Sequence, residues 1–170
     1  MITEAQSQTV TTEVGNKGHC RFCGAPLRTS VVDLGMAPLS NSIRSANQIY
    51  SVEHFYPLHV FVCDSCYLTQ LVDFIGPEAI FNSEYSYFSS FSTSWLDHAK
   101  RYADMMVKRF GFNQQSQVIE IASNDGYLLQ YFQPHGVPVL GIEPTSNTAA
   151  VAQEKGIPTV VEFFGVRLAE

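Results

Sequence analysis

Hydrophobic residues change their spacing along the chain, and the spacings predict three kinds of structure. Residues 19–76 contain short apolar runs separated by turn residues, which predicts strands. Residues 77–111 carry apolar residues three and four positions apart, which predicts helix. Residues 112–170 alternate between the two patterns. Residues 1–18 show neither pattern, and we expect them to form a disordered tail.

Two helices are expected within residues 77–111, with a linker rich in Tyr, Phe and Ser between them. The first begins near Pro77, because proline is tolerated in the first turn of a helix. The second is strongly periodic, with Thr93 or Ser94 as its candidate N-terminal cap and Gly111 as its stop. This part of the chain is therefore predicted to be a helical linker.

The alternation over residues 112–170 predicts parallel strands joined by right-handed crossovers. Strands are expected at SQVIEIAS, VPVLGIEP and IPTVVEF, and helices at GYLLQYFQPHG, at NTAAVAQEKG and from FGVRLAE onward. These three strands are fewer than the about five or six of a doubly wound domain. We therefore expect the chain to be truncated or to belong to a longer protein.

The cysteines form two C-x-x-C pairs, Cys20 with Cys23 and Cys63 with Cys66, and none is left over. Four thiolates suit a closed, tetrahedral zinc site with a structural role. Thirty-nine residues separate the pairs, more than the roughly 15–20 of a compact zinc ribbon, so the pairs should bracket an inserted segment. An iron–sulfur centre, a redox pair and two disulfides are the alternatives, and a cytosolic chain argues against structural disulfides.

The stretch VIEIASNDGYLL leaves the first expected parallel strand at the edge where ligands of such sheets bind. Its turn has one glycine, Gly126, whereas a pyrophosphate loop needs G-x-G-x-x-G, so an NAD-linked oxidoreductase fits poorly. Glu120 lies inside this strand, and Glu143 ends the next one, where a ribose-binding acid is found. Two acids and few glycines favour a cationic cofactor without phosphate, such as S-adenosylmethionine. The alternative is that Glu120 faces solvent and Glu143 is an ordinary turn acid.

Charge and hydropathy narrow the function classes. The net charge is −6 and the ten Lys and Arg residues are scattered, which argues against a nucleic-acid partner. No apolar run reaches the roughly 18 residues of a membrane span, and the N-terminus lacks the apolar core of a signal peptide. We therefore expect a cytoplasmic protein with no membrane partner.

Taken together, four motifs resemble the N-terminal part of the sugar C-methyltransferases: CRFCG…CDSC, YSYFSSFSTSW, VIEIASNDGYLL and GIEPTSN. The resemblance covers about residues 19–168. Members of this family act on nucleotide-linked keto-deoxysugars in deoxysugar biosynthesis. They have a four-cysteine zinc domain, a central S-adenosylmethionine-binding α/β domain and a C-terminal domain. Here E-I-A-S-N-D-G stands where methyltransferases usually have E/D-x-G-x-G-x-G.

The resemblance implies an α/β fold class: a small β-rich four-cysteine zinc-binding domain, a helical linker and the first half of a Rossmann-like methyltransferase domain. It also implies zinc ligation by Cys20, Cys23, Cys63 and Cys66. The methionine end of the cofactor would be lined by Glu120, Ala122, Asn124, Asp125 and Gly126. The ribose and adenine would lie against Glu143 and Pro144, respectively.

The resemblance further implies that residues 85–90 close as a lid over the cofactor and a nucleotide-sugar substrate. The contacts with substrate would come from Tyr85, Tyr87 and Ser89. The family's catalytic base lies in sequence beyond Glu170, so no catalytic residue is assigned; His98 and His135 have no partner that is visible in the sequence. A zinc-ribbon module that binds a protein, with a non-catalytic α/β appendage, is the alternative function.

Overall fold

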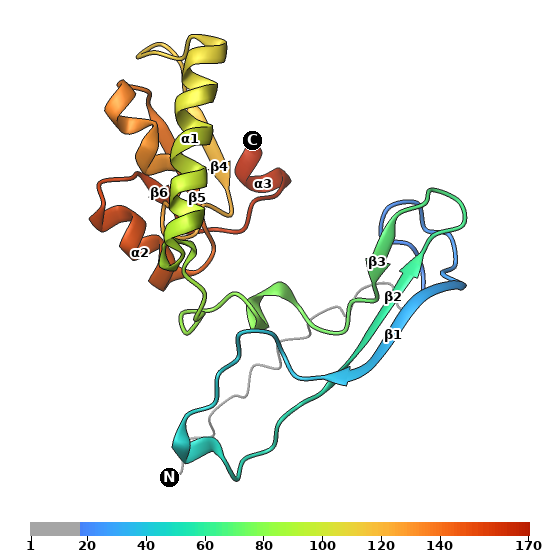
Figure 1. Ribbon diagram of the computed structural model, residues 1–170. Coiled ribbons are helices and arrows are strands. Elements are labelled where there is room, and N and C mark those ends of the chain that lie inside the picture. Colours follow the sequence, from blue (N-terminus) through green and yellow to red (C-terminus); the bar gives the residue numbers. More distant parts are fainter. Residues whose placement is uncertain (1–17) are drawn as a thin grey trace, which may run out of the picture. The chain divides into compact units, whose positions relative to one another are not determined.

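The computed structural model describes residues 18–170, which form two units (Figure 1). The units are residues 18–40 with Arg44–Ile80 (unit 1) and Asn41–Ile43 with Phe81–Glu170 (unit 2). Apart from Gly18, the tail expected at residues 1–18 lies outside the described residues. None of the helices in the described part is long and apolar enough to cross a lipid bilayer.

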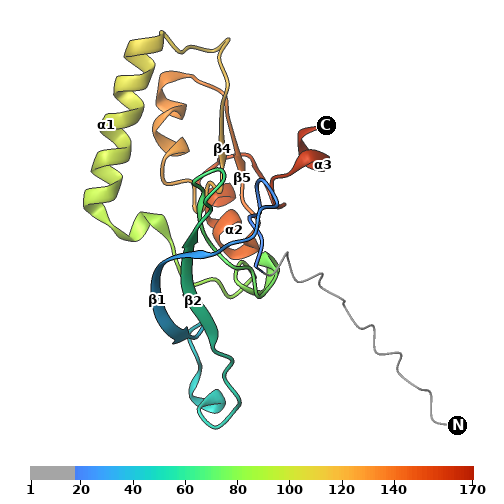
Figure 2. The same ribbon diagram turned by 90° about the vertical axis from the view of Figure 1, so that its right-hand side faces the viewer.

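Unit 1 is an antiparallel sheet with a cysteine cluster at one end, as its strand-like runs predict. The strands, in spatial order, are β1 (Thr29–Ala37), β2 (Tyr56–Val62) and β3 (Thr69–Leu71). Figure 2 shows β1 and β2 as a long curved ribbon, and the register between them shifts twice, which accounts for the curvature. The long connection between these two strands contains one short 3-10 helix, Ala46–Gln48.

Unit 1 has almost no apolar core. Its buried residues in the described part of the chain are Cys20, Cys63 and Gln70. Side chains of β1 that would normally be covered, such as Leu34 and Met36, are more than half exposed. A sheet of this size cannot be held by hydrophobic burial alone, so its stability must come from the cysteine cluster.

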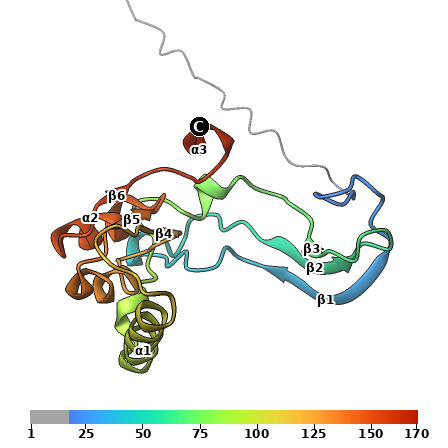
Figure 3. The ribbon, with the colours of Figure 1, turned by 90° about the horizontal axis from the view of Figure 1, so that it is seen from above.

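Unit 2 contains the parallel sheet that the sequence predicts, in the order β4-β5-β6. Its strands are β4 (Val118–Ile121), β5 (Val139–Ile142) and β6 (Thr159–Val160). Its helices are α1 (Thr93–Phe110), α2 (Ser146–Glu154) and the short α3 (Val166–Ala169). Figure 3 shows α1 nearly end-on beside the turns that follow β4.

The core of unit 2 lies where α1, these turns and the sheet meet. Its buried members are Ala103, Leu129, Phe132, Val137, Val139, Ala152 and Ile157. The other face of β4 is open, because Ile119 and Ile121 are each just over half exposed. The small sheet with one uncovered face is consistent with a truncated α/β domain.

The expected helix over GYLLQYFQPHG is wrong. The structure has two 3-10 helices there, Leu129–Tyr131 and Gln133–His135. Backbone bonds such as Phe132 N–H to the Leu129 carbonyl span three residues rather than four. Pro134 has no N–H with which to continue an α-helix, so the segment is divided into two short turns that still bury two apolar side chains.

The predicted periodic helix is confirmed as α1, and Gly111 ends it with φ of +67°. The expected caps are wrong, because Ser92 is the N-cap and its Oγ accepts from the Trp95 N–H at 3.3 Å. The first expected helix is reduced to the single 3-10 turn Pro77–Ala79. Residues 77–92 are therefore mostly irregular, and backbone groups of Tyr85, Tyr87 and Ser89 bond to side chains of other segments.

Candidate metal centre and cofactor cavity

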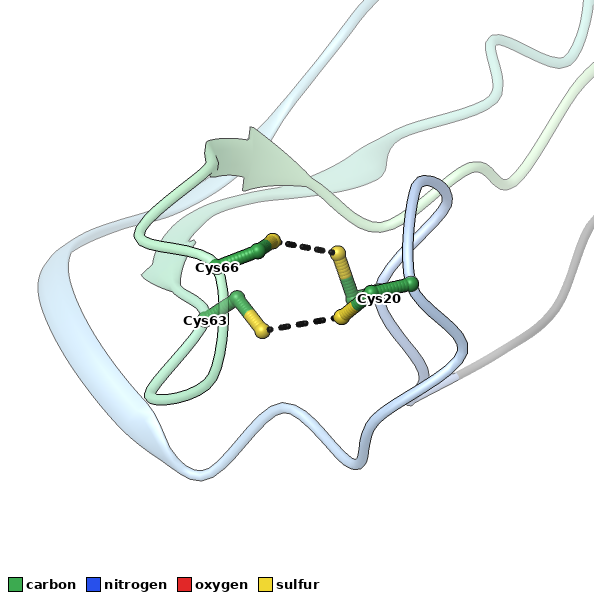
Figure 4. Close-up of side chains that lie close together, drawn as sticks. Cys20, Cys63 and Cys66 are labelled. Atoms are coloured by element: carbon green, nitrogen blue, oxygen red, sulfur yellow. Dashed lines mark hydrogen bonds between the residues drawn. The ribbon is translucent and has the colours of Figure 1, made fainter.

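The four cysteines converge as a metal site. Their Sγ atoms all lie within 4.8 Å of one another. The Cys20 and Cys66 sulfurs are 3.5 Å apart, as are those of Cys23 and Cys63 (Figure 4). Thiolates at about 2.3 Å from a tetrahedral zinc lie roughly 3.8 Å apart, so the cluster fits zinc and no pair is a disulfide. The cluster therefore suits zinc, held in a closed four-thiolate site with a structural role.

Two turns of the same geometry present the sulfurs. In the first, the Gly24 N–H donates to the Cys20 carbonyl at 2.9 Å; in the second, the Tyr67 N–H donates to the Cys63 carbonyl at 2.9 Å. In both turns the residue after the second cysteine has a left-handed backbone, with φ of +75° at Gly24 and +63° at Tyr67. Glycine satisfies this requirement in the first turn, and the second turn accepts the cost of a larger residue.

Gln70 is a contact that the sequence did not reveal. Its side chain is buried, its Nε2 donates to the Cys20 Sγ at 3.1 Å, and its Oε1 accepts from the Arg21 N–H at 2.9 Å. The backbone N–H of Cys23 and, more weakly, Gln70 lower the pKa of the Cys20 thiol to about 6 against the effect of burial. These contacts favour the thiolate form of Cys20, which is the form that binds a metal. No signal in the sequence pointed to this contact, because it depends on how β3 pairs with β2.

Unit 2 has a cavity of about 430 Å³ at the carboxyl ends of β4 and β5. This is the edge at which parallel α/β sheets bind ligands, and the volume is in the usual range for small-molecule sites. The lining residues are Phe81, Tyr85, Tyr87, Ser89, Ile121, Ala122, Asn124, Tyr127, Ile142, Glu143, Pro144, Phe163 and Phe164. The cavity therefore draws on several separate segments, two of which directly follow strands.

Seven of the ten cofactor and substrate residues expected from the sequence line this one cavity. They are Ala122, Asn124, Glu143, Pro144, Tyr85, Tyr87 and Ser89. Glu120, Asp125 and Gly126 are not in its lining. The aromatic residues Phe81, Tyr127, Phe163 and Phe164 were missed, and only Tyr127, next to the loop glycine, carried a positional signal.

The loop after β4 is built from alternating left-handed residues. Ala122, Asn124 and Gly126 have φ of +59°, +51° and +74°. At Gly126 a Cβ would lie 2.3 Å from Ile157 Cδ1 and 3.3 Å from Ala152 Cβ. Glycine is therefore required here by packing inside the unit as well as by backbone conformation, and its contact with a cofactor stays a prediction.

Glu143 is buried, with 4% of its surface exposed, and it holds two turns together. Its Oε2 accepts from the Asn124 N–H at 2.8 Å, while its Oε1 accepts from the Thr145 N–H at 2.9 Å and from the Thr145 hydroxyl. Glu143 therefore stabilises two turns and also lines the cavity. A carboxylate has about four lone-pair positions, so it retains capacity for a ligand.

Glu120 is largely buried and does not face solvent. Burial is the main cause that raises the pKa of Glu120 to about 7. The charges of Asp125 and Glu143 raise this pKa further, whereas a hydrogen bond with Tyr127 lowers it. The Oε2 of Glu120 has no hydrogen-bond partner among residues 18–170. Burial also raises the pKa of Tyr127 to about 12, so this phenol stays protonated. Glu120 therefore lies close to two other acids, Asp125 and Glu143, and Lys155 forms an ion pair with Asp125 at 3.4 Å.

The two histidines considered as a base, His98 and His135, lie outside the cavity. The ring of His98 stacks on Trp95 with a centroid distance of 5.2 Å. His135 has the partner that the sequence did not show, because its Nε2 lies 2.9 Å from the Asp104 carboxylate. Neither histidine lines the cavity, so neither is placed to act on a ligand bound there.

Known proteins resemble both units. A zinc-binding domain family matches residues 20–81, which include all four cysteines. Over 151 residues the chain is 32% identical to the C-methyltransferase NovU of Streptomyces niveus. The match covers 89% of this chain and 36% of that relative, so the chain spans about a third of its length. The zinc-binding domain match agrees with the four-cysteine cluster, and together with the longer alignment it supports the N-terminal portion of a sugar C-methyltransferase.

Proposed function

We propose that this chain supplies the zinc domain and the cofactor-binding half of an S-adenosylmethionine-dependent C-methyltransferase that acts on a nucleotide-linked keto-deoxysugar. The observation that carries the proposal is the convergence of seven expected residues on one cavity at the carboxyl edge of the parallel sheet. The relative's name supports methyl transfer to carbon, and the remaining steps concern the fit of the cofactor.

The composition of the cavity wall supports a ligand without phosphate. The lining contains no Lys or Arg, although either would be expected beside a pyrophosphate. The loop after β4 has one glycine. The side chains of Asn124 and Asp125 in this loop accept hydrogen bonds from the Ser89 and Ser90 N–H groups, so these side chains are committed to protein contacts. A nicotinamide dinucleotide therefore fits the wall poorly.

The electrostatics support a cationic ligand. Glu143 lines the cavity, while Glu120 and Asp125 lie behind its wall. Tyr85, Tyr87 and the other aromatic residues add ring faces, which attract a positive centre. S-adenosylmethionine carries a sulfonium and an ammonium, and its adenine can stack on such rings. In this arrangement Glu143 accepts from the ribose hydroxyls and Pro144 lies against the adenine.

The bound cofactor would supply an electrophilic methyl group. The residues of this chain bind and orient it, and the wall of aromatic side chains excludes water from it. The zinc site has no open position for a substrate, so its function is to stabilise unit 1. A base that removes the proton next to the substrate ketone is not assigned to any residue of this chain.

Calorimetric titration of S-adenosylmethionine tests the proposal. We expect Glu143→Gln to weaken binding by roughly 10- to 100-fold, because a hydrogen bond to a charged group contributes about 1.5–3 kcal/mol. Glu154→Gln, at an exposed position in α2, is the matched control and should leave the affinity unchanged. A folded, zinc-loaded protein that gives no binding heat would contradict the proposal.

The substrate, partner and compartment remain part of the proposal. A nucleotide-linked keto-sugar is the proposed partner; neither nucleic acid nor a membrane is proposed, because the charge is −6 with scattered basic residues and no long apolar run. Four free cysteines in a metal-type cluster suit a reducing compartment, so we propose the cytoplasm. Methyl transfer to a panel of nucleotide-linked keto-sugars, assayed with the intact protein, tests the substrate class.

A second function is favoured by the exposed apolar residues in the long β1–β2 connection. Tyr50 is fully exposed, and Ile49 and Val52 are mostly exposed. Exposed apolar groups of this kind are typical of protein-interaction surfaces, so unit 1 could act as a zinc-ribbon interaction module. This function is an alternative to the enzyme, so measurable methyl transfer by the intact protein would count against it. An intact protein that neither binds S-adenosylmethionine nor transfers methyl would favour it.

A further inference from the structure

Residues 85–90 are held in place by side chains from other parts of unit 2. Asn124, in the loop after β4, makes two of these contacts. Its Nδ2 donates to the Tyr87 carbonyl at 3.1 Å, and its Oδ1 accepts from the Ser89 N–H at 2.8 Å. The amide oxygen and the amide nitrogen of Asn124 therefore both bond to the main chain of this segment.

The loop fixes Asn124 just as firmly. Its own N–H donates to Glu143 Oε2 at 2.8 Å, and only 8% of its surface is exposed. Its φ of +51° lies in the left-handed region, which asparagine tolerates better than most residues. An aspartate would fit the backbone but could not donate to a carbonyl, so the position needs both the amide chemistry and the backbone tolerance of asparagine.

Three more contacts hold the ends of the same segment. Asn147 Nδ2 donates to the Tyr85 carbonyl at 2.7 Å. The Ser90 N–H donates to Asp125 Oδ2 at 3.3 Å, and Lys155 Nζ donates to Ser90 Oγ at 3.0 Å. The segment is therefore fixed near both ends as well as at its centre.

Every second side chain of the segment lines the cavity, so the position of the backbone sets the position of the cavity wall. Tyr85, Tyr87 and Ser89 are every second residue, and all three line the cavity. The backbone groups of these same three residues make the contacts with Asn124 and Asn147. Fixing the main chain thus fixes one whole wall of the cavity.

We propose that Asn124 is a positioning residue whose amide holds residues 85–90 as a preformed wall of the cavity, so that a ligand enters a built site rather than drawing a lid over itself. The closing lid that the resemblance implies is the alternative, and it stays untested. The nature of the ligand rests on the proposed function, but the fixed wall does not, because all of its contacts are made between groups of this chain.

Amide hydrogen exchange in the intact protein tests the wall directly. The Ser89 and Ser90 N–H groups should exchange slowly before any ligand is added, and saturating S-adenosylmethionine should slow them little further. In Asn124→Gly, which removes the side chain and still allows a positive φ, exchange at Ser89 should rise roughly 10-fold because its acceptor is lost. Affinity for S-adenosylmethionine should fall while the urea midpoint changes little.

Two further variants complete the experiment. Asn124→Asp keeps the acceptor for Ser89 but loses the donor to Tyr87, so it should fall between wild type and Asn124→Gly. Asn113→Ala is the matched control, because the Asn113 side chain bonds to the nearby main chain of Gly111 and Gln115 and not to residues 85–90. It should change neither exchange at Ser89 nor affinity.

The outcomes separate the two proposals. Fast exchange at Ser89 and Ser90 that slows only when S-adenosylmethionine binds would overturn the fixed wall in favour of a closing lid. Unchanged exchange in Asn124→Gly would overturn the role of Asn124. Slow exchange in a protein that does not bind S-adenosylmethionine would overturn the proposed function and support the wall.

Discussion

Substituting Gly126 by alanine separates a packing requirement from a ligand requirement at the loop after β4. Alanine at φ of +74° costs about 1–2 kcal/mol in backbone strain. Its Cβ would lie 2.3 Å from Ile157 Cδ1, inside the core of unit 2, and overpacking of that kind costs about 1–3 kcal/mol more. We therefore expect Gly126→Ala to lower the free energy of unfolding by about 2–5 kcal/mol, a large share of a typical total.

Gly156→Ala is the matched control. Its φ is +76°, and an added Cβ would meet nothing within 4 Å, so it pays the backbone strain alone. The difference between the two variants in urea unfolding, monitored through the α1 helix signal, should then report the contact with Ile157. We expect this difference to be about 1–3 kcal/mol.

A double variant identifies the clash. Ile157→Val removes the Cδ1 atom and by itself costs about 0.5–1.5 kcal/mol. In the Gly126→Ala background it should instead restore stability, giving a coupling energy of about 1 kcal/mol or more. Equal stabilities for Gly126→Ala and Gly156→Ala, or no recovery in the double variant, would refute the packing argument. Weaker cofactor binding at unchanged stability would mean that the glycine serves the ligand alone.

Three further predictions concern the metal site and the buried acid. Chelation of zinc should abolish exchange protection in β1–β3 and leave the helix signal of α1, because unit 1 has almost no apolar core; a sheet that stays protected without metal would contradict this. Gln70→Leu should speed zinc loss to a chelator by roughly 10-fold, and Gln70→Glu should speed it further by placing a charge beside the Cys20 sulfur; equal rates for all three proteins would argue against this contact. Burial raises the Glu120 pKa from 4.5 to about 7, so the folded state holds a proton that the unfolded state loses, and stability should fall as pH rises from about 4.5 to 7. Urea midpoints across this range should be flatter in Glu120→Gln, and an equal slope in both proteins would rule out Glu120 as the cause.

The metal site could be predicted from sequence because its chemistry is local. Each C-x-x-C pair forms its own turn, and Gly24 marked the first. The second turn was less visible, because Tyr67 occupies the equivalent left-handed position. Gln70 could not be predicted, since its contact with Cys20 depends on how β3 pairs with β2.

The cavity was predictable in outline because parallel strands bring their carboxyl ends to one edge. This placed Ala122 and Glu143 together without further information. The aromatic wall was not predictable, since Phe81 and Phe163 reach the cavity from distant segments without a periodic pattern. The 3-10 turns at Leu129–Tyr131 and Gln133–His135 were missed because buried apolar residues at helical spacing suit an α-helix equally well.

A crystal structure of the protein with S-adenosylmethionine would test the central claim most directly. The account predicts the cofactor in the cavity at the ends of β4 and β5, with its ribose hydroxyls on the Glu143 carboxylate and its adenine against Pro144. Residues 85–90 should have the same backbone with and without it. Density for the cofactor at another place, or no cofactor density in the cavity of crystals soaked at saturating concentration, would contradict the account.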